Sequence, residues 1–128
     1  MAELLERIRR EIRSHGPLAF ARFMELALYD PDGGYYMRGS PVGPAGDFVT
    51  ASDRGRGFGR AIARQLAEID RRAGPFDPFH VVEFGAGRGL LARDVLAELG
   101  QDVRYVAVDR SPAMRAASRE AAPSAQVL

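Results

Sequence analysis

The amino-acid sequence predicts an α/β fold in which a helical N-terminal region precedes a β-α-β-α unit of parallel sheet. Two observations predict the sheet: apolar, strand-like runs end at Phe84 and at Val108, and a helix-like segment separates them. A third observation predicts the helical region, because apolar residues recur at helical spacing in three segments before residue 73. Two strands joined through a helix run parallel, with a right-handed crossover.

The composition of the 128-residue chain is that of one ordinary globular domain, without cysteine and with only two histidines, His15 and His80. We therefore expect no disulfide and no metal site. The net charge of +1 gives no reason to expect nucleic acid as a partner. No apolar run reaches the ~18 residues of a membrane span, so we expect no membrane insertion.

The charged residues also bear on where the protein resides. All 18 basic residues are arginine, which is typical of a protein from a GC-rich bacterial genome. The N-terminal arginines alternate with glutamates, whereas a mitochondrial presequence avoids acidic residues. The sequence thus predicts a cytoplasmic, bacterial protein.

Two amphipathic helices are predicted in the first 30 residues. Residues 3–14 gather four apolar side chains on one face, with charged side chains opposite. Pro17 follows a break in this pattern and suits the first turn of a second helix. The apolar residues of the second helix recur at helical spacing, at Phe20, Phe23, Met24, Ala27 and Leu28. A turn signal at residues 30–34 ends this helix.

A loop rich in glycine and proline covers residues 37–52 and has no helical period. Loops of this length in compact domains are often functional. A third helix, predicted over residues 57–72, follows the loop. The sequence thus divides into an N-terminal helical region, residues 1–73, and the first part of a sheet domain, residues 79–128.

The sheet domain continues with a helix over residues 90–99 and a second strand over residues 103–108. Ser111 is a suitable N-cap for a last helix, with Pro112 at its first position. Two parallel strands cannot bury both faces of a sheet, and a third strand would begin only at Val127. We therefore expect this chain to be the N-terminal part of a longer protein.

A glycine-rich turn, residues 85–89, follows the first strand and opens the next helix. Glycines at a sharp strand-to-helix turn let a small molecule lie against bare backbone. Asp109 ends the second strand 20 residues after the last glycine of the turn. A carboxylate there can accept hydrogen bonds from two ribose hydroxyls. These features predict a site for a nucleoside-bearing cofactor.

The pattern Glu-x-Gly-x-Gly-x-Gly, which begins at Glu83, resembles motif I of class I S-adenosylmethionine-dependent methyltransferases. A dinucleotide-binding turn would require glycine or alanine where this chain has Leu90. The helix N-terminus after the turn favours the carboxylate of a bound methionine portion. Glu83 would meet the cationic side of the ligand, and Asp109 would hold the ribose. The cofactor-binding residues expected on this basis are Glu83, Gly85, Ala86, Gly87, Gly89, Asp109 and Arg110.

Other interpretations of the turn remain open at this point. A Gly-rich strand-to-helix turn can be purely structural, and Arg88 is expected to be a surface residue of the helix that follows. An oxidoreductase domain that binds NAD(P) or FAD is one alternative class of protein. A non-catalytic module that binds a partner through its helical half is another.

The order of motifs before the turn closely resembles the MidA family of methyltransferases. The resemblance is carried by the run from Gly16 to Tyr36, by the segment Gly46-Asp47-Phe48-Val49-Thr50 and by the glycine turn. Mitochondrial members are assembly factors for respiratory complex I and are implicated in symmetric dimethylation of a protein arginine. The resemblance implies a Rossmann-like fold, S-adenosyl-L-methionine as cofactor, protein-arginine N-methyltransferase activity, and a protein substrate such as a complex I-type subunit.

The resemblance also implies an active-site loop at the mouth of the cofactor site, with Gly46, Asp47, Phe48 and Thr50. A purely structural alternative is that Asp47 caps a turn and Phe48 anchors the loop in the core. After this segment the chain departs from the family pattern, although Asp53 keeps the acidic residue. No catalytic residue is assigned, because family members are much longer. We expect little or no methyltransferase activity from the 128-residue chain alone.

Overall fold

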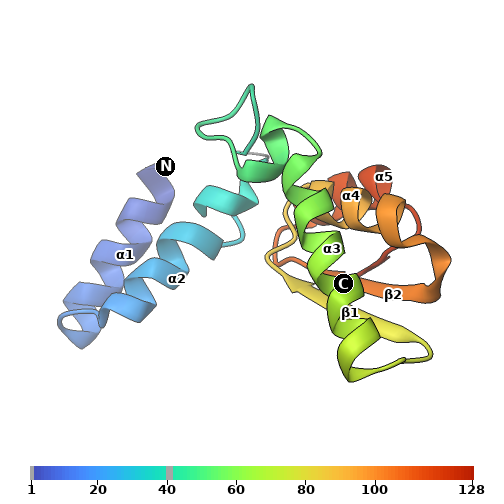
Figure 1. Ribbon diagram of the computed structural model, residues 1–128. Helices are drawn as coiled ribbons and strands as arrows, with labels where there is room; N and C mark the ends of the chain where they lie inside the picture. Colours follow the sequence, from blue (N-terminus) through green and yellow to red (C-terminus); the bar gives the residue numbers. More distant parts are fainter. Residues whose placement is uncertain (1, 40–41) are drawn as a thin grey trace. The chain divides into compact units, whose positions relative to one another are not determined.

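The computed structural model describes residues 2–39 and 42–128, and it divides into two compact units, Met1–Pro41 and Val42–Leu128 (Figure 1). The first unit consists of α1 (Ala2–His15), α2 (Phe20–Tyr29) and a short 3-10 helix, η1 (Tyr35–Met37). The helices agree with the prediction, except that Pro17 precedes α2 and does not lie within its first turn. Pro17 lacks an N–H donor, and the helix begins three residues later, after the extended Ala19.

Polar contacts and aromatic contacts hold the first unit together. The turn after α2 is organised by Asp30, which is only 4% exposed and pairs with Arg7 of α1. The same carboxylate accepts the backbone N–H of Gly33 at 3.0 Å. Beyond the turn, Tyr36 stacks on Tyr29 with ring centroids 5.8 Å apart. A buried carboxylate needs such partners, so the turn fixes where the chain leaves α2.

The second unit contains a three-stranded parallel sheet with the order β1-β2-β3. The strands are β1 (Phe79–Phe84), β2 (Val103–Val108) and β3 (Gln126–Val127). Their helices are α4 (Leu90–Leu99) and α5 (Pro112–Ala121). The α/β fold with an incomplete sheet is therefore confirmed, and the third strand begins near the residue where it was expected.

The helix α3 (Gly57–Ala73) belongs to the second unit, where it packs on α4 (Figure 1). Gly59 of α3 lies so close to Asp94 of α4 that no side chain would fit at residue 59. Ala63, one turn further along, is 1% exposed. The sequence placed this helix with residues 1–73, because an amphipathic pattern does not say which partner its apolar face meets.

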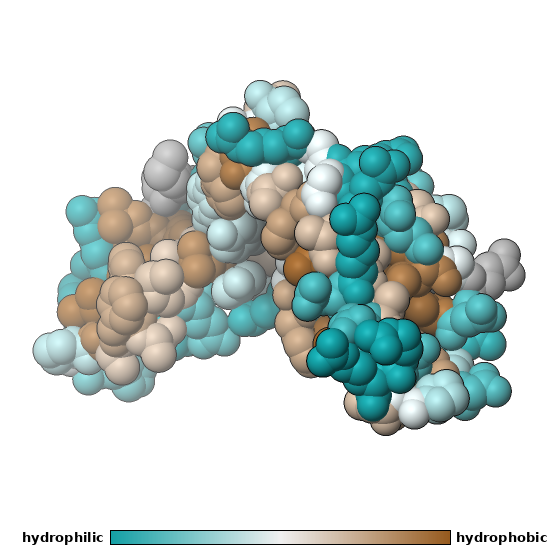
Figure 2. Space-filling view, in the orientation of Figure 1, coloured by the Kyte–Doolittle hydropathy of each residue, from teal (hydrophilic) through white to brown (hydrophobic). Residues whose placement is uncertain are grey.

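Alanines predominate among the buried residues in the core of the second unit. Small residues let the helices approach the sheet closely. The outer face of α3 is charged instead, and Figure 2 shows hydrophilic residues along that face. The buried core members are Ala63, Ala86, Ala92, Val95, Tyr105, Ala107 and Ala122.

One face of the sheet is left uncovered by the helices of the second unit. Alternate residues of β1 point to that face, and Val82 is 52% and Phe84 is 82% exposed. Parallel sheets are normally covered on both faces. None of the described helices is long and apolar enough to cross a membrane.

Candidate functional site

The carboxyl ends of β1 and β2 bring the sequence-predicted site residues together. Both Gly85 and Ala86 donate their backbone N–H groups to the carbonyl oxygen of Val108, at 2.8 and 3.1 Å. The N–H of Gly87 donates to the Oδ2 atom of Asp109 at 2.8 Å. The glycine turn and the acid after β2 are therefore in direct contact, as expected of neighbouring parallel strands.

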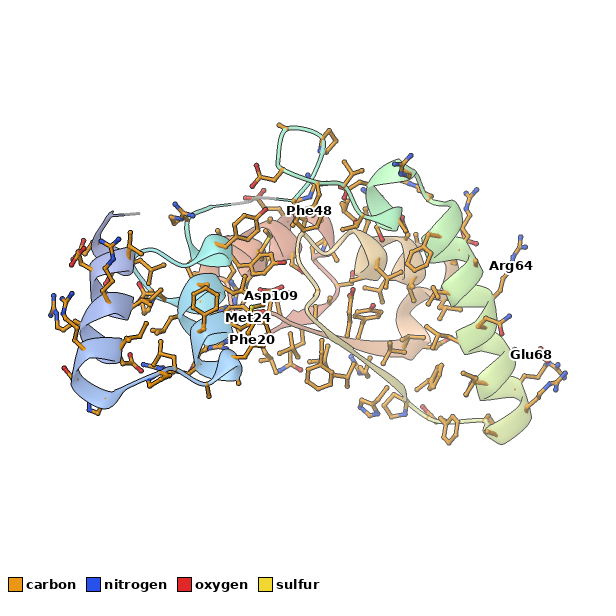
Figure 3. The ribbon with its side chains drawn as sticks, turned by 90° about the vertical axis from the view of Figure 1, so that its left-hand side faces the viewer. Phe20, Met24, Phe48, Arg64, Glu68 and Asp109 are labelled. Atoms are coloured by element: carbon orange, nitrogen blue, oxygen red, sulfur yellow. The ribbon has the colours of Figure 1, made fainter. Side chains whose placement is uncertain are left out.

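The carboxylate of Asp109 is held in place by two backbone donors. Its Oδ2 atom accepts from Gly87, and its Oδ1 atom accepts the N–H of Ser111 at 2.8 Å. A carboxylate has about four acceptor positions, so both oxygens keep capacity for a further donor. Figure 3 labels Asp109 and Phe48, which both belong to the second unit. Such a fixed acceptor suits a pair of ribose hydroxyls.

The three glycines of the turn have two different structural roles. All have positive φ angles, +71° at Gly85, +55° at Gly87 and +72° at Gly89, which side-chain-bearing residues rarely adopt. A Cβ atom added at Gly85 or Gly87 would meet nothing within 4 Å. A Cβ atom at Gly89 would lie 2.8 Å from the Cα atom of Ser118 in α5. The first two glycines border open space, whereas the third allows close packing of α5.

Glu83 lies at the end of β1, half-buried beneath the turn. Its Oε2 atom accepts the hydroxyl proton of Tyr105 at 2.9 Å. Burial raises the pKa of the Glu83 carboxyl, the Tyr105 hydrogen bond acts in the opposite direction, and the negative charge of Asp109 raises the pKa further. Tyr105 is 3% exposed, and its own pKa is raised by burial and by Glu83.

The electrostatics of this edge suit a ligand with charges of both signs. Glu83 and Asp109 supply two carboxylates on one side of the turn, and their mutual repulsion is relieved by a cation. The N-terminus of α4 begins at Leu90 and carries partial positive charge from its unpaired N–H groups. S-adenosylmethionine matches this arrangement: its sulfonium and ammonium groups suit the two carboxylates, and its carboxylate suits the N-terminus of α4.

Residues 42–54, here called the 42–54 loop, fold back on themselves. The Gly43 N–H donates to the carbonyl oxygen of Phe48 at 2.8 Å, and Gly46 donates to the carbonyl oxygen of Gly43 at 2.8 Å. Phe48 is 42% exposed, so it does not anchor the loop in the core of this unit. The loop ends in a 3-10 helix, η2 (Ala51–Arg54), which overlaps the end of the 37–52 segment predicted to lack helix.

The end of the loop is held by Thr50, Asp53 and Arg88. The backbone N–H and the hydroxyl of Thr50 donate to the Oδ2 atom of Asp53 at 2.7 and 2.8 Å. The other oxygen of Asp53 pairs with the guanidinium of Arg88, which lies in the glycine turn. Arg88 was expected at the surface, and this expectation is wrong: its side chain is 28% exposed and contacts the loop.

The remaining predicted residues have structural partners. Ser111 is fully buried and caps α5 through the Met114 N–H at 3.4 Å, as expected. Arg110 is exposed, and its carbonyl oxygen accepts from Arg115 at 2.9 Å. Within residues 2–39 and 42–128, no group of three or more His, Asp or Glu side chains is arranged to hold a metal ion.

Sequence reasoning did not identify Tyr105 and Arg88 as parts of this site. A buried tyrosine needs a partner for its hydroxyl, and a tyrosine in the strand that pairs with the strand of Glu83 was an available signal. No comparable signal existed for Arg88, because its partner Asp53 lies 35 residues away in the sequence.

A parallel sheet with an open glycine turn after β1 and a fixed carboxylate after β2 defines a Rossmann-like protein with a site for a nucleoside-bearing cofactor. The family model of S-adenosyl-L-methionine-dependent methyltransferases matches residues 61–126, and the chain belongs to this family. This result confirms the class of protein inferred from motif I.

Individual relatives agree with the family. The chain is 41% identical over 96 residues to the mitochondrial protein arginine methyltransferase NDUFAF7 homolog of Drosophila melanogaster. It is 32% identical over 98 residues to mitochondrial protein arginine methyltransferase NDUFAF7 of Rattus norvegicus. These matches cover 75% and 77% of this chain but only 22% of each relative.

The fold also matches solved structures. A COG1565 superfamily member from Burkholderia thailandensis, crystallised with S-adenosyl-homocysteine, superposes with a TM-score of 0.82 and 34% identity. The match covers 99% of this chain and 37% of that one. A second structure of a COG1565 superfamily protein from the same organism gives a TM-score of 0.76 and 35% identity. This chain therefore spans about a third of these crystallised proteins, as the shares of 37% and 34% show.

Proposed function

We propose that this chain is the cofactor-binding part of an S-adenosyl-L-methionine-dependent protein arginine methyltransferase. The observation that carries the proposal is the pairing of two open glycines, Gly85 and Gly87, with the fixed carboxylate of Asp109. The open backbone accommodates the methionine portion of the ligand, and the carboxylate accepts the ribose hydroxyls. Glu83 faces the cationic side.

Methyl transfer from a sulfonium is an in-line displacement to which a protein contributes orientation and exclusion of water. In this chain the glycine turn and Asp109 fix the two ends of the ligand, so the sulfonium between them has a defined position. Glu83 holds its negative charge near that position and orients the positively charged end of the ligand. The Tyr105 hydroxyl keeps the Glu83 carboxylate in one orientation.

The proposed methyl acceptor is an arginine side chain of a protein, by analogy with the named activity of the relatives. A guanidinium stays protonated, so carboxylates must align it and accept its charge. Asp53 does not serve in this role, because its side chain is 1% exposed and both oxygens are engaged. Glu83 and Asp47 are the acidic residues of this region that remain as candidates.

Further features of the protein are proposals from the same sources. A respiratory complex I-type subunit is the proposed substrate, because the relatives carry the name NDUFAF7 and the motif order resembles that family. We propose a bacterial cytoplasmic location from the all-arginine composition, although the named relatives are mitochondrial. Fractionation of the source cells, followed by methyl-arginine mapping of complex I in a strain lacking the gene, tests both.

Titration of the 128-residue chain with S-adenosylmethionine, S-adenosylhomocysteine and NADH tests the proposed cofactor. A ligand at 100 times its dissociation constant adds ~2.7 kcal/mol to the free energy of unfolding. We expect the two adenosyl ligands to raise the melting temperature and NADH to leave it unchanged. Protection by NADH alone would favour the oxidoreductase class, and a stable fold without any ligand effect would favour the partner-binding module.

A further inference from the structure

Arg88 occupies an unusual place between the two kinds of glycine in the turn. Gly87 before it borders open space, and Gly89 after it packs on α5. The Arg88 side chain is 28% exposed and leaves the turn toward the 42–54 loop. The side chain is thus partly covered, and the contacts that its guanidinium makes account for its position.

The first contact of Arg88 is an ion pair with Asp53, at the end of the loop. The Asp53 side chain is 1% exposed, and its second oxygen accepts two hydrogen bonds from Thr50. The Thr50 N–H and hydroxyl, together with the charge of Arg88, keep the pKa of Asp53 below its usual range. This buried carboxylate is therefore ionised at neutral pH and depends on Arg88 as its counter-charge.

The second contact of Arg88 is with the backbone of Gly43, at the start of the loop. Gly43 has a φ angle of +120°, and a Cβ atom there would run into the Arg88 guanidinium, with Cζ at 2.8 Å. The guanidinium thus lies next to Gly43, whose φ angle of +120° favours glycine. Gly43 is itself joined to Phe48 by the 2.8 Å backbone hydrogen bond.

These contacts fix both ends of one segment to the cofactor turn. The segment between the anchors at residues 43 and 53 contains Gly46, Asp47, Phe48 and Thr50, which motif order alone had suggested for the site. An ion pair on an exposed surface contributes little, whereas a pair with one buried partner fixes geometry. Arg88 stands beside the part of the turn assigned to the methionine portion of the ligand.

We propose that Arg88 is a positioning residue, which holds the 42–54 loop against the glycine turn so that the loop covers the methionine end of the bound cofactor. The identity of the covered ligand rests on the proposed function, whereas the contacts between Arg88 and the loop do not depend on it. Loss of Arg88 releases the loop at both anchors, and the cofactor then dissociates faster from a site that stays folded. Gly43 and Asp53 serve the same purpose from the side of the loop.

The test measures loop order and ligand affinity separately. Hydrogen exchange of the 128-residue chain without ligand reports on the loop, and calorimetry with S-adenosylhomocysteine reports on the site. The variants are Arg88→Gln and Gly43→Ala, with Arg60→Gln as the control. Arg60 pairs with Glu98 at 2.8 Å, in an exposed ion pair of the same unit.

In Arg88→Gln we expect exchange of residues 42–54 to rise at least about tenfold while exchange of β1 and β2 stays unchanged. S-adenosylhomocysteine affinity should fall at least about tenfold, as for loss of a charge-assisted contact. Gly43→Ala should act in the same direction, and Arg88→Lys should restore part of the affinity. Arg60→Gln should change neither measurement.

Three results would overturn the proposal in distinguishable ways. Unchanged loop exchange in Arg88→Gln would show that Arg88 does not hold the loop. A loosened loop with unchanged affinity would show that the loop does not cover the ligand. If the wild-type chain binds no S-adenosylhomocysteine while Arg88→Gln still loosens the loop, the proposed function fails and Arg88 is a folding contact only.

Discussion

Substitution of alanine at Gly89 and at Gly85 should separate the packing role of the turn from its binding role. At Gly89 the positive φ angle of +72° costs an alanine ~1–2 kcal/mol. The added Cβ atom would also lie 2.8 Å from the Ser118 Cα atom and 3.0 Å from its Cβ atom, which a backbone cannot readily avoid. Overpacking of this kind costs ~1–3 kcal/mol. Gly89→Ala should therefore lower the free energy of unfolding by about 2–5 kcal/mol.

Gly85→Ala should behave differently, because nothing lies within 4 Å of its added Cβ atom. The strain of the +71° φ angle alone remains, so the free energy of unfolding should fall by only ~1–2 kcal/mol. The Cβ atom enters the space assigned to the ligand, however, so affinity for S-adenosylhomocysteine should be lost.

Urea denaturation followed by circular dichroism measures the free energies of unfolding, and calorimetry measures the affinities. Equal destabilisation by the two alanines would refute the division of the turn into an open part and a packed part. Unimpaired S-adenosylhomocysteine binding by Gly85→Ala would refute the placement of the ligand. Ser118→Gly in the Gly89→Ala background should recover part of the lost stability, since it removes the Oγ and Cβ atoms that the new methyl group meets.

Three more predictions concern single polar groups. Tyr105→Phe removes the hydroxyl that donates to Glu83 and should cost ~1–3 kcal/mol of unfolding free energy in urea titrations, whereas an unchanged value would contradict the 2.9 Å hydrogen bond. The pKa of Glu83 is higher in the folded chain than in the unfolded chain, so protonation of Glu83 stabilises the fold without ligand. This stabilisation is fully present below the unfolded-state pKa and is lost as the pH rises through the folded-state pKa. Affinity for the cationic S-adenosylmethionine should conversely fall as the pH drops below neutral and the Glu83 carboxylate takes up a proton, and Glu83→Gln should weaken binding and abolish this dependence in calorimetric titrations. In the first unit, Arg7→Ala leaves Asp30 without its cation and should cost ~1–3 kcal/mol, since Arg7 is itself one-third exposed; faster proteolysis confined to residues 2–39 is the expected readout.

The strands and the glycine turn could be predicted because their signals are local. An apolar run that ends in Glu83, followed by alternating glycines, specifies a strand and a turn with little help from the rest of the chain. The contact between the turn and Asp109 followed from parallel topology alone, since parallel strands share one carboxyl edge. This contact could therefore be predicted although the glycine turn and Asp109 are far apart in the sequence.

Long-range partners were harder to predict. The helix α3 has the same amphipathic pattern whether it packs on the first unit or on α4, and only the fit of Gly59 to Asp94 decides. Arg88 looked like a surface residue because arginine in a helix usually is one. Its burial depends on Asp53 and on a glycine at residue 43, and no periodicity links these positions.

The hydrogen bond from the Gly87 N–H to Asp109 has a consequence for mutagenesis of this site. Asp109→Ala deletes an expected sugar contact and at the same time frees a backbone amide that the carboxylate immobilises, so the turn itself can relax. A loss of affinity in that variant would mix two causes and overstate what the sugar contact contributes. Asp109→Asn keeps one acceptor oxygen, so only one of the Gly87 and Ser111 N–H groups can retain its partner, and this variant disturbs the turn less than Asp109→Ala does.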